Sequence, residues 1–196
     1  MKKLFRGVAT AVTTPFVNGG AIDYDAHARQ IEFQIQNSAD AIVVCGTTGE
    51  ASTLSDEERK GLIKFTVEKT ARRIPVIAGA GSNDTMHALR LAQMAKECGA
   101  DAHLQVTPYY NKTSQKGLIK HYLYIADRVD LPMILYNVPS RTGMNIAPST
   151  YAELAKHPHI VGFKEANANI ADLIRTLDLC GDDIYAYSGE DQLTLP

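Results

Sequence analysis

One lysine of this chain stands at the end of an apolar run, where a charged side chain is out of place. The run 160–163 reads Ile-Val-Gly-Phe and is followed by Lys164, a pattern typical of a parallel strand covered on both faces. Apolar surroundings disfavour the ammonium form and lower the lysine pKa, which leaves an amine able to attack a ketone and form a Schiff base. The alternative is a lysine that extends past the strand end and keeps its ammonium in water.

Two threonines between glycines follow an earlier apolar run. Residues 46–50 read Gly-Thr-Thr-Gly-Glu. The glycines permit a tight turn that directs backbone N–H groups and the hydroxyls of Thr47 and Thr48 inward, an arrangement suited to a small carboxylate. No Gly-Lys-Ser/Thr follows, so this is not a phosphate loop. A plain glycine turn without a ligand is the alternative.

A tyrosine and an arginine stand close together after a third apolar run, in the segment 135–143. Tyr136 falls at the end of the run, where its phenol can pass a proton to or from a substrate. Arg141 falls in the following loop, where it can hold a carboxylate with two parallel hydrogen bonds. Taken alone, the two residues are better interpreted as a core tyrosine and a surface arginine.

Seven short apolar runs supply the strands that would position these side chains. They cover 7–12, 41–45, 75–79, 103–107, 132–136, 160–164 and 184–188. Their starts are roughly 24 to 34 residues apart, which is the length of one strand and one crossover helix. The chain is therefore predicted to alternate strands with helices.

Helix start signals stand between the runs. Ser55 and Glu58 form a capping box, and Asp23 precedes another amphipathic segment. Asn83 or Asp84 is expected to cap a third helix, and Pro148 suits a first helical turn.

This repeat allows an open doubly wound sheet or a (β/α)8 TIM barrel. The doubly wound fold would call for a glycine-rich fingerprint after the first strand, and the Gly-x-Gly at 79–81 is neither early nor complete. Polar residues instead follow many of the runs: Thr13, Thr14, Thr47, Thr48, Asn83, Tyr109, Tyr110, Tyr136, Lys164, Ser188, Gly189 and Glu190. A barrel gathers such residues on one face, so we predict a barrel.

The chain is shorter than an eight-stranded barrel, which takes about 250 residues. It has 196 residues and stops shortly after the seventh run. We therefore expect one domain over 1–196, incomplete at its carboxyl end and lacking the last strand and helices. Either the chain is a fragment of a longer protein or a partner completes it.

Composition favours small-molecule chemistry. The net charge is −2 and the sequence pI about 6.3, with no basic patch for nucleic acid and no segment of membrane-spanning length. Three widely spaced cysteines suit a reducing cytosol, so we expect a cytoplasmic protein. The six histidines show no metal-ligand spacing, and we expect no metal.

Four motifs together resemble the dihydrodipicolinate synthases, a group within the class I pyruvate-dependent aldolases. They are GTTGE at 46–50, VTPYYN at 106–111, LYNVPSRTG at 135–143 and GFKEA at 162–166. They occur in the expected order and spacing, and the resemblance spans the whole chain.

The resemblance implies a role for each matched residue. Lys164 would form the Schiff base with pyruvate, so that no cofactor is needed. Tyr136 would carry protons, linked through Thr48 to Tyr110 of a neighbouring subunit. The carboxylate of pyruvate would be held by Thr47 and Thr48.

Two further residues are assigned by the same resemblance. Arg141 would bind the carboxylate of the second substrate, and a backbone carbonyl at Gly189 would contact the site. The implied activity is a lyase that condenses pyruvate with L-aspartate 4-semialdehyde to 4-hydroxy-tetrahydrodipicolinate, in the lysine and diaminopimelate pathway. A homodimer or homotetramer is implied because Tyr110 must come from a second chain.

The resemblance also implies an allosteric lysine site, near Asn83, His87 and Tyr109. His87 stands where an acidic residue would hold the ammonium of lysine, and Asp56 where a histidine is expected. Weak or absent feedback inhibition is therefore predicted.

Two other interpretations remain. Aldolases that cleave N-acetylneuraminate or 2-keto-3-deoxy sugar acids share the lysine, the tyrosine and a similar glycine turn, whereas Thr48, the pair at 109–110 and Arg141 favour the synthase. The other interpretation is a truncated barrel without catalytic activity.

Overall fold

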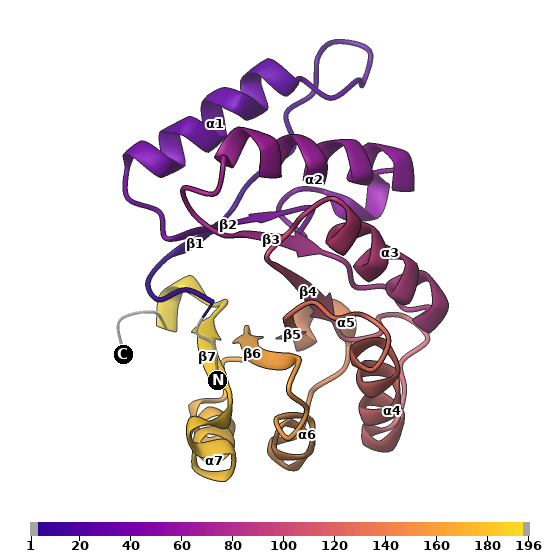
Figure 1. Ribbon diagram of the computed structural model, residues 1–196. Helices are drawn as coiled ribbons and strands as arrows, with labels where there is room; N and C mark the ends of the chain where they lie inside the picture. The colour runs from indigo at the N-terminus through magenta and orange to yellow at the C-terminus, as the bar shows by residue number, and fades with distance from the viewer. Residues whose placement is uncertain (1–3, 194–196) are drawn as a thin grey trace. The chain divides into compact units, whose positions relative to one another are not determined.

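The computed structural model describes residues 4–193, which form seven strands alternating with helices (Figure 1). The strands are β1 Ala9–Ala11, β2 Ala41–Val44, β3 Val76–Gly79, β4 Ala102–Val106, β5 Met133–Asn137, β6 Ile160–Glu165 and β7 Tyr185–Ser188. The α-helices are α1 Tyr24–Gln36, α2 Asp56–Thr70, α3 Thr85–Glu97, α4 Gln115–Ala126, α5 Pro139–Thr142, α6 Pro148–Leu154 and α7 Ile170–Cys180. Three short 3-10 helices lie at Ala51–Thr53, Gly181–Asp183 and Asp191–Leu193.

The described residues divide into two compact units. The amino-terminal unit comprises 4–80 and Gln93–His103, and the carboxy-terminal unit comprises Gly81–Ala92 and 104–193. Each unit has its own set of parallel strands and covering helices, and each is described by itself.

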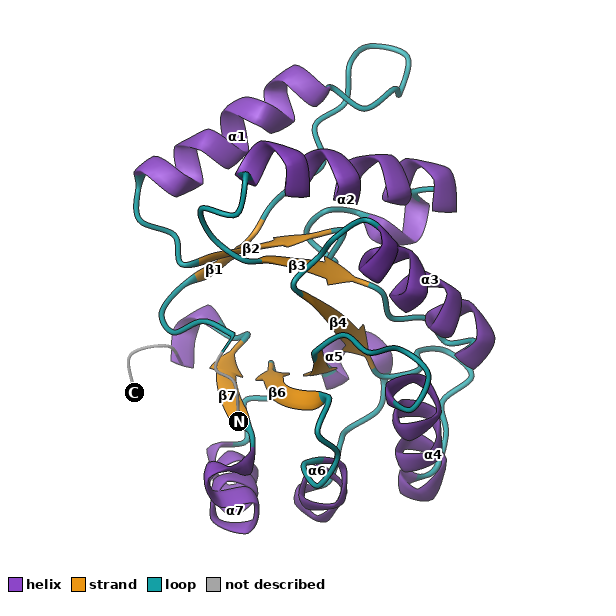
Figure 2. Cartoon of the chain, in the orientation of Figure 1, coloured by secondary structure: helices purple, strands orange, loops and turns teal. Residues whose placement is uncertain are grey.

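In the amino-terminal unit, β1, β2 and β3 pair in parallel. Ala9 is the register partner of Ala41, and Ile42 that of Val76. All four residues of β2 are buried, as expected for a parallel strand covered on both faces. Helices α1 and α2 lie together on one side of these strands (Figure 2).

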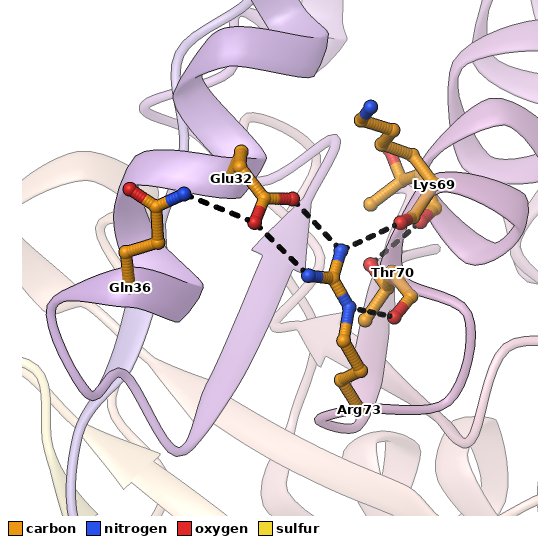
Figure 3. Close-up of polar contacts among 6 residues, drawn as sticks. Glu32, Gln36, Lys69, Thr70 and Arg73 are labelled. Atoms are coloured by element: carbon orange, nitrogen blue, oxygen red, sulfur yellow. Dashed lines mark hydrogen bonds and ion pairs between the residues drawn. The ribbon is translucent and has the colours of Figure 1, made fainter.

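A polar clamp joins α1 to the carboxyl end of α2 (Figure 3). Arg73 donates to both carboxylate oxygens of Glu32, at 3.0 and 2.9 Å. The same guanidinium donates to the carbonyls of Lys69 and Thr70, each at 3.0 Å. Arg73 thus donates to carbonyl groups that have no N–H partner within the last turn of α2. Its bidentate hydrogen bond to Glu32 connects α2 to α1.

In the carboxy-terminal unit, β5, β6 and β7 also pair in parallel. Lys164 is the register partner of Tyr136 on β5 and of Tyr187 on β7. One irregularity in the register lies between Met133 and Ile134. Helices α6 and α7 lie side by side and cover one face of these strands (Figure 1).

Strand β4 has residues in both units. Its beginning lies beside β3, because Asp101 N donates to Val76 O at 2.9 Å, and its end lies beside β5, because Thr107 N donates to Tyr136 O at 3.2 Å. The strand order is β1 to β7 without reversal. This is the order of a (β/α)8 barrel through its seventh strand, whereas a doubly wound sheet would reverse its order at a switch point.

The predicted strands and helix starts are confirmed. Each strand lies within two residues of the predicted run. Ser55 and Glu58 form the capping box at α2, and Asp23 caps α1. Asp84, the second of the two candidates, caps α3 by accepting a hydrogen bond from Met86 N at 2.9 Å. Among residues 4–193, no helix has the length and apolar composition required to cross a bilayer.

Candidate active site

Lys164 stands near the end of β6, with its side chain half-buried. Its Nζ lies 4.6 Å from the centroid of the Tyr136 ring and makes no hydrogen bond or ion pair with the described residues. Burial lowers the pKa of Lys164, while the negative charge of Asp191 acts in the opposite direction and raises it. The amine is therefore closer to its reactive, uncharged form than an ordinary surface lysine.

Tyr136 is buried on β5, directly across from Lys164, with only 7% of its surface exposed. Because register partners on neighbouring strands point to the same face, the phenol and the amine belong to one site. The structure thus brings together the two residues that the sequence singled out for proton transfer and for the Schiff base.

Gly189 lies against the aliphatic part of Lys164. A Cβ at this position would stand 2.7 Å from Lys164 Cε and 2.9 Å from Cγ, both closer than real Cβ contacts. The Gly189 N–H donates to the carbonyl of Glu165 at 2.7 Å, which fixes the approach. The sequence predicted a contact through the Gly189 carbonyl, and the structure adds that a side chain there would displace the lysine.

Arg141 lies on α5, where the sequence predicted a loop. Pro139 takes the first helical position, where a backbone N–H would have no acceptor within the helix, so its absence from proline loses no hydrogen bond. Gly143 ends the turn with a φ of 67°. The side chain of Arg141 is exposed. This short helix sets Arg141 on the segment directly after Tyr136, with its guanidinium open to solvent and available to an anionic ligand.

Tyr110 is 90% exposed and has a φ of 68°. Positive φ is uncommon for an aromatic residue and stores backbone strain. Its loop is attached to the neighbouring one, because Asn111 Nδ2 donates to the carbonyl of Asn83 at 3.0 Å. The ring is therefore in solvent, and the backbone turns at Tyr110, where Asn111 N donates to Tyr109 O at 2.8 Å.

Three residues predicted for an allosteric site lie in this neighbourhood. Asn83 accepts the hydrogen bond from Asn111 and so lies beside the loop of Tyr109, whose side chain is partly exposed. His87 lies in the first turn of α3, with its Nδ1 at 3.3 Å from Ser82 Oγ. Asn83 and Tyr109 thus lie on adjoining loops of the carboxy-terminal unit, and His87 lies at the start of the helix that follows Asn83.

Thr47 and Thr48 belong to the amino-terminal unit, in the turn after β2, and both are exposed. The turn is held closely: Thr14 Oγ1 donates to Gly49 O at 2.7 Å, and a Cβ on Gly49 would stand 3.0 Å from Val12 O. A larger residue at position 49 would push the turn away from β1. Thr47 and Thr48 thus lie in a turn that is held close to the backbone of residues 12–14 in the same unit.

Cys45, which begins this turn, is buried and has a φ of 54°. Burial raises the pKa of its thiol to about 12, so it stays protonated and is a poor nucleophile. Burial likewise raises the pKa of Cys98 and Cys180, and all three are free thiols. Within residues 4–193, no three side chains of His, Cys, Asp or Glu form a group that could hold a metal ion.

Sequence reasoning missed one pair beside the site, Asn137 and Glu165. Each directly follows a predicted site residue, Tyr136 or Lys164, and the two are register partners. The signal in the sequence was a glutamate directly after a lysine at the end of an apolar strand. Burying two successive charged side chains costs free energy unless each has a polar partner or a chemical role.

The chain matches the Dihydrodipicolinate synthetase family over residues 4–196. The 4-hydroxy-tetrahydrodipicolinate synthase of Acetivibrio thermocellus is 52% identical over 195 residues, which are 100% of this chain and 66% of that protein. The protein of the same name from Citrifermentans bemidjiense is 53% identical over 193 residues, 98% of this chain and 66% of that protein. The chain thus spans about two thirds of the length of these curated relatives.

Solved structures agree with the fold. Dihydrodipicolinate synthase from Aquifex aeolicus aligns with a TM-score of 0.95 and 46% identity, over 98% of this chain and 66% of that one. The DapA-2 synthase from Bacillus anthracis aligns with a TM-score of 0.97 and 41% identity, over 100% of this chain and 67% of that one. The chain therefore has the fold of these proteins over the part that it covers.

Proposed function

Because the chain belongs to the dihydrodipicolinate synthetase family, we propose that it acts as a 4-hydroxy-tetrahydrodipicolinate synthase, a Schiff-base-forming lyase of lysine and diaminopimelate biosynthesis. The substrates would be pyruvate and L-aspartate 4-semialdehyde. The observation that carries this proposal is the half-buried amine of Lys164, 4.6 Å from the ring centroid of Tyr136 and without a hydrogen-bond partner among the described residues.

The chemistry follows from an uncharged amine beside a phenol. Lys164 attacks the keto carbon of pyruvate, the oxygen leaves as water, and an iminium remains. The positive nitrogen withdraws electrons, so the methyl group loses a proton and an enamine forms. The enamine carbon then attacks the aldehyde of the second substrate, whose oxygen is protonated to a hydroxyl, and the iminium on Lys164 re-forms. The amino group of the second substrate displaces Lys164 from the iminium carbon, which closes the ring and frees the lysine. Tyr136 moves protons in these steps.

The remaining residues would bind rather than react. The hydroxyls and backbone N–H groups at Thr47 and Thr48 hold the carboxylate of pyruvate, and Arg141 holds that of aspartate semialdehyde. Gly189 contacts the site through its carbonyl and leaves room for the lysine. The exposure of both threonines and of Arg141 supports this assignment, because a ligand can reach them.

Tyr110 would complete the proton relay of a second subunit, through Thr48. Its 90% exposure supports this role, because a ring in solvent is accessible to a second chain. A homodimer is the smallest assembly that allows it, and a homotetramer is the alternative. The proposed reaction uses no metal and no cofactor, since the pyruvate is bound covalently to the lysine. We further propose a cytoplasmic location, which suits three free thiols, and weak inhibition by lysine.

Trapping of the Schiff base tests the proposal. The chain is incubated with pyruvate, reduced with borohydride and analysed by mass spectrometry, with peptide mapping to locate the adduct. We expect one reduced pyruvate on Lys164. The matched control is Lys156→Met, which removes an exposed lysine paired with Glu153. Labelling that spreads over surface lysines, or none at all, would contradict the proposal and favour a barrel without catalytic activity.

Substrate choice needs a second assay. The chain is tested as it stands and joined to the carboxyl-terminal third of the Acetivibrio thermocellus relative, with aspartate semialdehyde and with N-acetylneuraminate or a 2-keto-3-deoxy sugar acid. We expect turnover of aspartate semialdehyde by the joined protein. Faster cleavage of a sugar acid would assign the chain to a sister aldolase instead.

A further inference from the structure

Two successive cross-strand pairs connect the ends of β5 and β6. Tyr136 is the register partner of Lys164, and Asn137 is the register partner of Glu165. Successive residues of a strand point to opposite faces, so Asn137 and Glu165 point away from the amine and the phenol. Glu165 therefore does not reach a substrate held by Lys164.

The carboxylate of Glu165 accepts hydrogen bonds from three elements. Asn137 Nδ2, on β5, lies 2.9 Å from Oε1 and 3.1 Å from Oε2. The backbone N–H of Asn167, after β6, donates to Oε1 at 2.8 Å, and the Tyr151 hydroxyl, on α6, donates to Oε2 at 3.1 Å. One side chain thus connects a neighbouring strand, a loop and a covering helix.

Asn137 extends this network toward α5. Its Nδ2 also lies 2.6 Å from Asn145 Oδ1, and its Oδ1 accepts a hydrogen bond from Ile146 N at 3.2 Å. The segment 143–147 follows α5, which carries Arg141. The network therefore reaches backbone N–H groups in the loop after β6 and in the segment after α5.

The carboxylate of Glu165 contributes little to stability for the free energy that its burial costs. It forms no ion pair with a lysine or arginine of the described residues, and burial raises its pKa while the hydrogen bonds lower it. A well-packed apolar residue would serve stability equally well, because buried charges gain little over apolar packing. What hydrogen bonds provide and apolar contacts do not is a defined geometry.

We propose that Glu165 is a positioning residue which, through Asn137, fixes the relative placement of Lys164 and Tyr136. The inference rests on the proposed function. It predicts that losing the acceptor slows formation of the pyruvate adduct, because small misplacements of reacting groups cost large factors in rate. Pyruvate binding should change much less, since neither Glu165 nor Asn137 faces the ligand.

The test compares Glu165→Met with Glu165→Gln, measuring the rate of borohydride-trapped adduct against pyruvate concentration. Both variants lose the charge, but glutamine keeps an oxygen for Asn137 and Asn167, and its amide can donate to the Tyr151 hydroxyl. We expect the limiting rate of Glu165→Met to fall about tenfold, with the half-saturating pyruvate concentration nearly unchanged. Glu165→Gln should stay within about threefold of the wild type.

A double variant tests whether the two residues act as one unit. Asn137→Ala should slow adduct formation as Glu165→Met does, and the combination should cost little more than either alone, because both changes remove the same contact. Glu153→Met, at an exposed position of α6, is the matched control and should keep the wild-type rate. Independent, multiplying losses would contradict a shared positioning role.

A lower melting temperature with an unchanged limiting rate in Glu165→Met would overturn the proposal and leave the network a purely structural role. If that variant does not fold, Asn137→Ala removes the same contact from the other side, and an unchanged limiting rate there is the overturning result. An absent adduct in the wild type would instead refute the proposed function, so the two failures are distinguishable.

Discussion

The ends of β5 and β6 carry two polar pairs that differ in how their hydrogen bonds are used. On one face, the amine of Lys164 lies over the ring of Tyr136 and has no hydrogen-bond partner among the described residues. On the other face, the carboxylate of Glu165 accepts from Asn137, Asn167 and Tyr151.

This difference separates reactivity from rigidity. A buried polar group whose hydrogen bonds are satisfied is held in place and is difficult to perturb. A partly buried amine without such bonds has a shifted pKa and a free lone pair, which is what an attack on a carbonyl requires. Adjacent residues on the same strands thus support opposite tasks.

The strongest test of the comparison removes the amine. Lys164→Met should abolish adduct formation, because no other group of the site can form the Schiff base. The same change should raise the free energy of unfolding by about 1 kcal/mol, since a partly buried amine is replaced by an apolar side chain. Trapping and chemical denaturation at pH 7 check the two expectations. A destabilised variant would mean that the lysine is structurally satisfied, contrary to the contrast drawn with Glu165.

His121 offers an intermediate case on α4, with one hydrogen bond made and one missing. Its Nδ1 lies 2.8 Å from Thr85 Oγ1, its buried Nε2 has no hydrogen-bond partner within residues 4–193, and burial lowers its pKa to about 4. Below pH 6.5 this histidine is protonated in the unfolded chain, whereas in the folded chain it stays neutral until about pH 4. The contribution of His121 to stability should therefore fall by about 3 kcal/mol between these pH values and stay constant above them.

Denaturant unfolding at several pH values checks this expectation, with His121→Gln as the comparison. Glutamine can bond Thr85 but does not titrate, so the variant should lose less stability on acidification. Parallel profiles for the two proteins would show that His121 is not responsible.

Gly189→Ala tests whether the free space beside Lys164 matters. The added Cβ would lie 2.7 Å from Lys164 Cε and must move the side chain. We expect adduct formation to slow by about tenfold or more, because the amine leaves its place over Tyr136. Glu153→Met, at an exposed position of α6, is the control and should keep the wild-type rate. Equal rates in both variants would show that the lysine tolerates displacement.

The smallest effect is expected from Asp191→Asn. The charge of Asp191 raises the pKa of Lys164 against the effect of burial, so its loss should lower that pKa further. More of the amine is then uncharged at neutral pH, and adduct formation should speed up by at most a few-fold, because water screens an exposed carboxylate. The pH dependence of trapping should shift to lower pH. A shift to higher pH would contradict the assigned direction.

Local features of the fold were predictable because they depend on neighbouring residues. The strands follow from continuous apolar runs, the cap of α2 from Ser55 and Glu58, and the start of α6 from Pro148. The lowered pKa of Lys164 was predicted from the apolar run that precedes it, and the structure confirms the direction.

Other features of the site were not predictable from local patterns. The helix α5 was expected to be a loop, since a turn of four residues has no periodicity to reveal it. The network of Glu165 depends on residues distant in sequence. Roles for Thr47, Thr48 and Arg141 remain predictions that rest on family membership and on their exposure.

By itself, the amino-acid sequence determined which segments become strands and helices and which strand ends in an amine, because short-range periodicity and capping suffice for both. Only the tertiary structure decided that Tyr136 stands opposite Lys164, that Gly189 lies against the lysine and that Glu165 bonds to Asn137. The reason is physical: register and burial arise when strands far apart in the chain pair, and a shift of one residue would reverse which side chains meet.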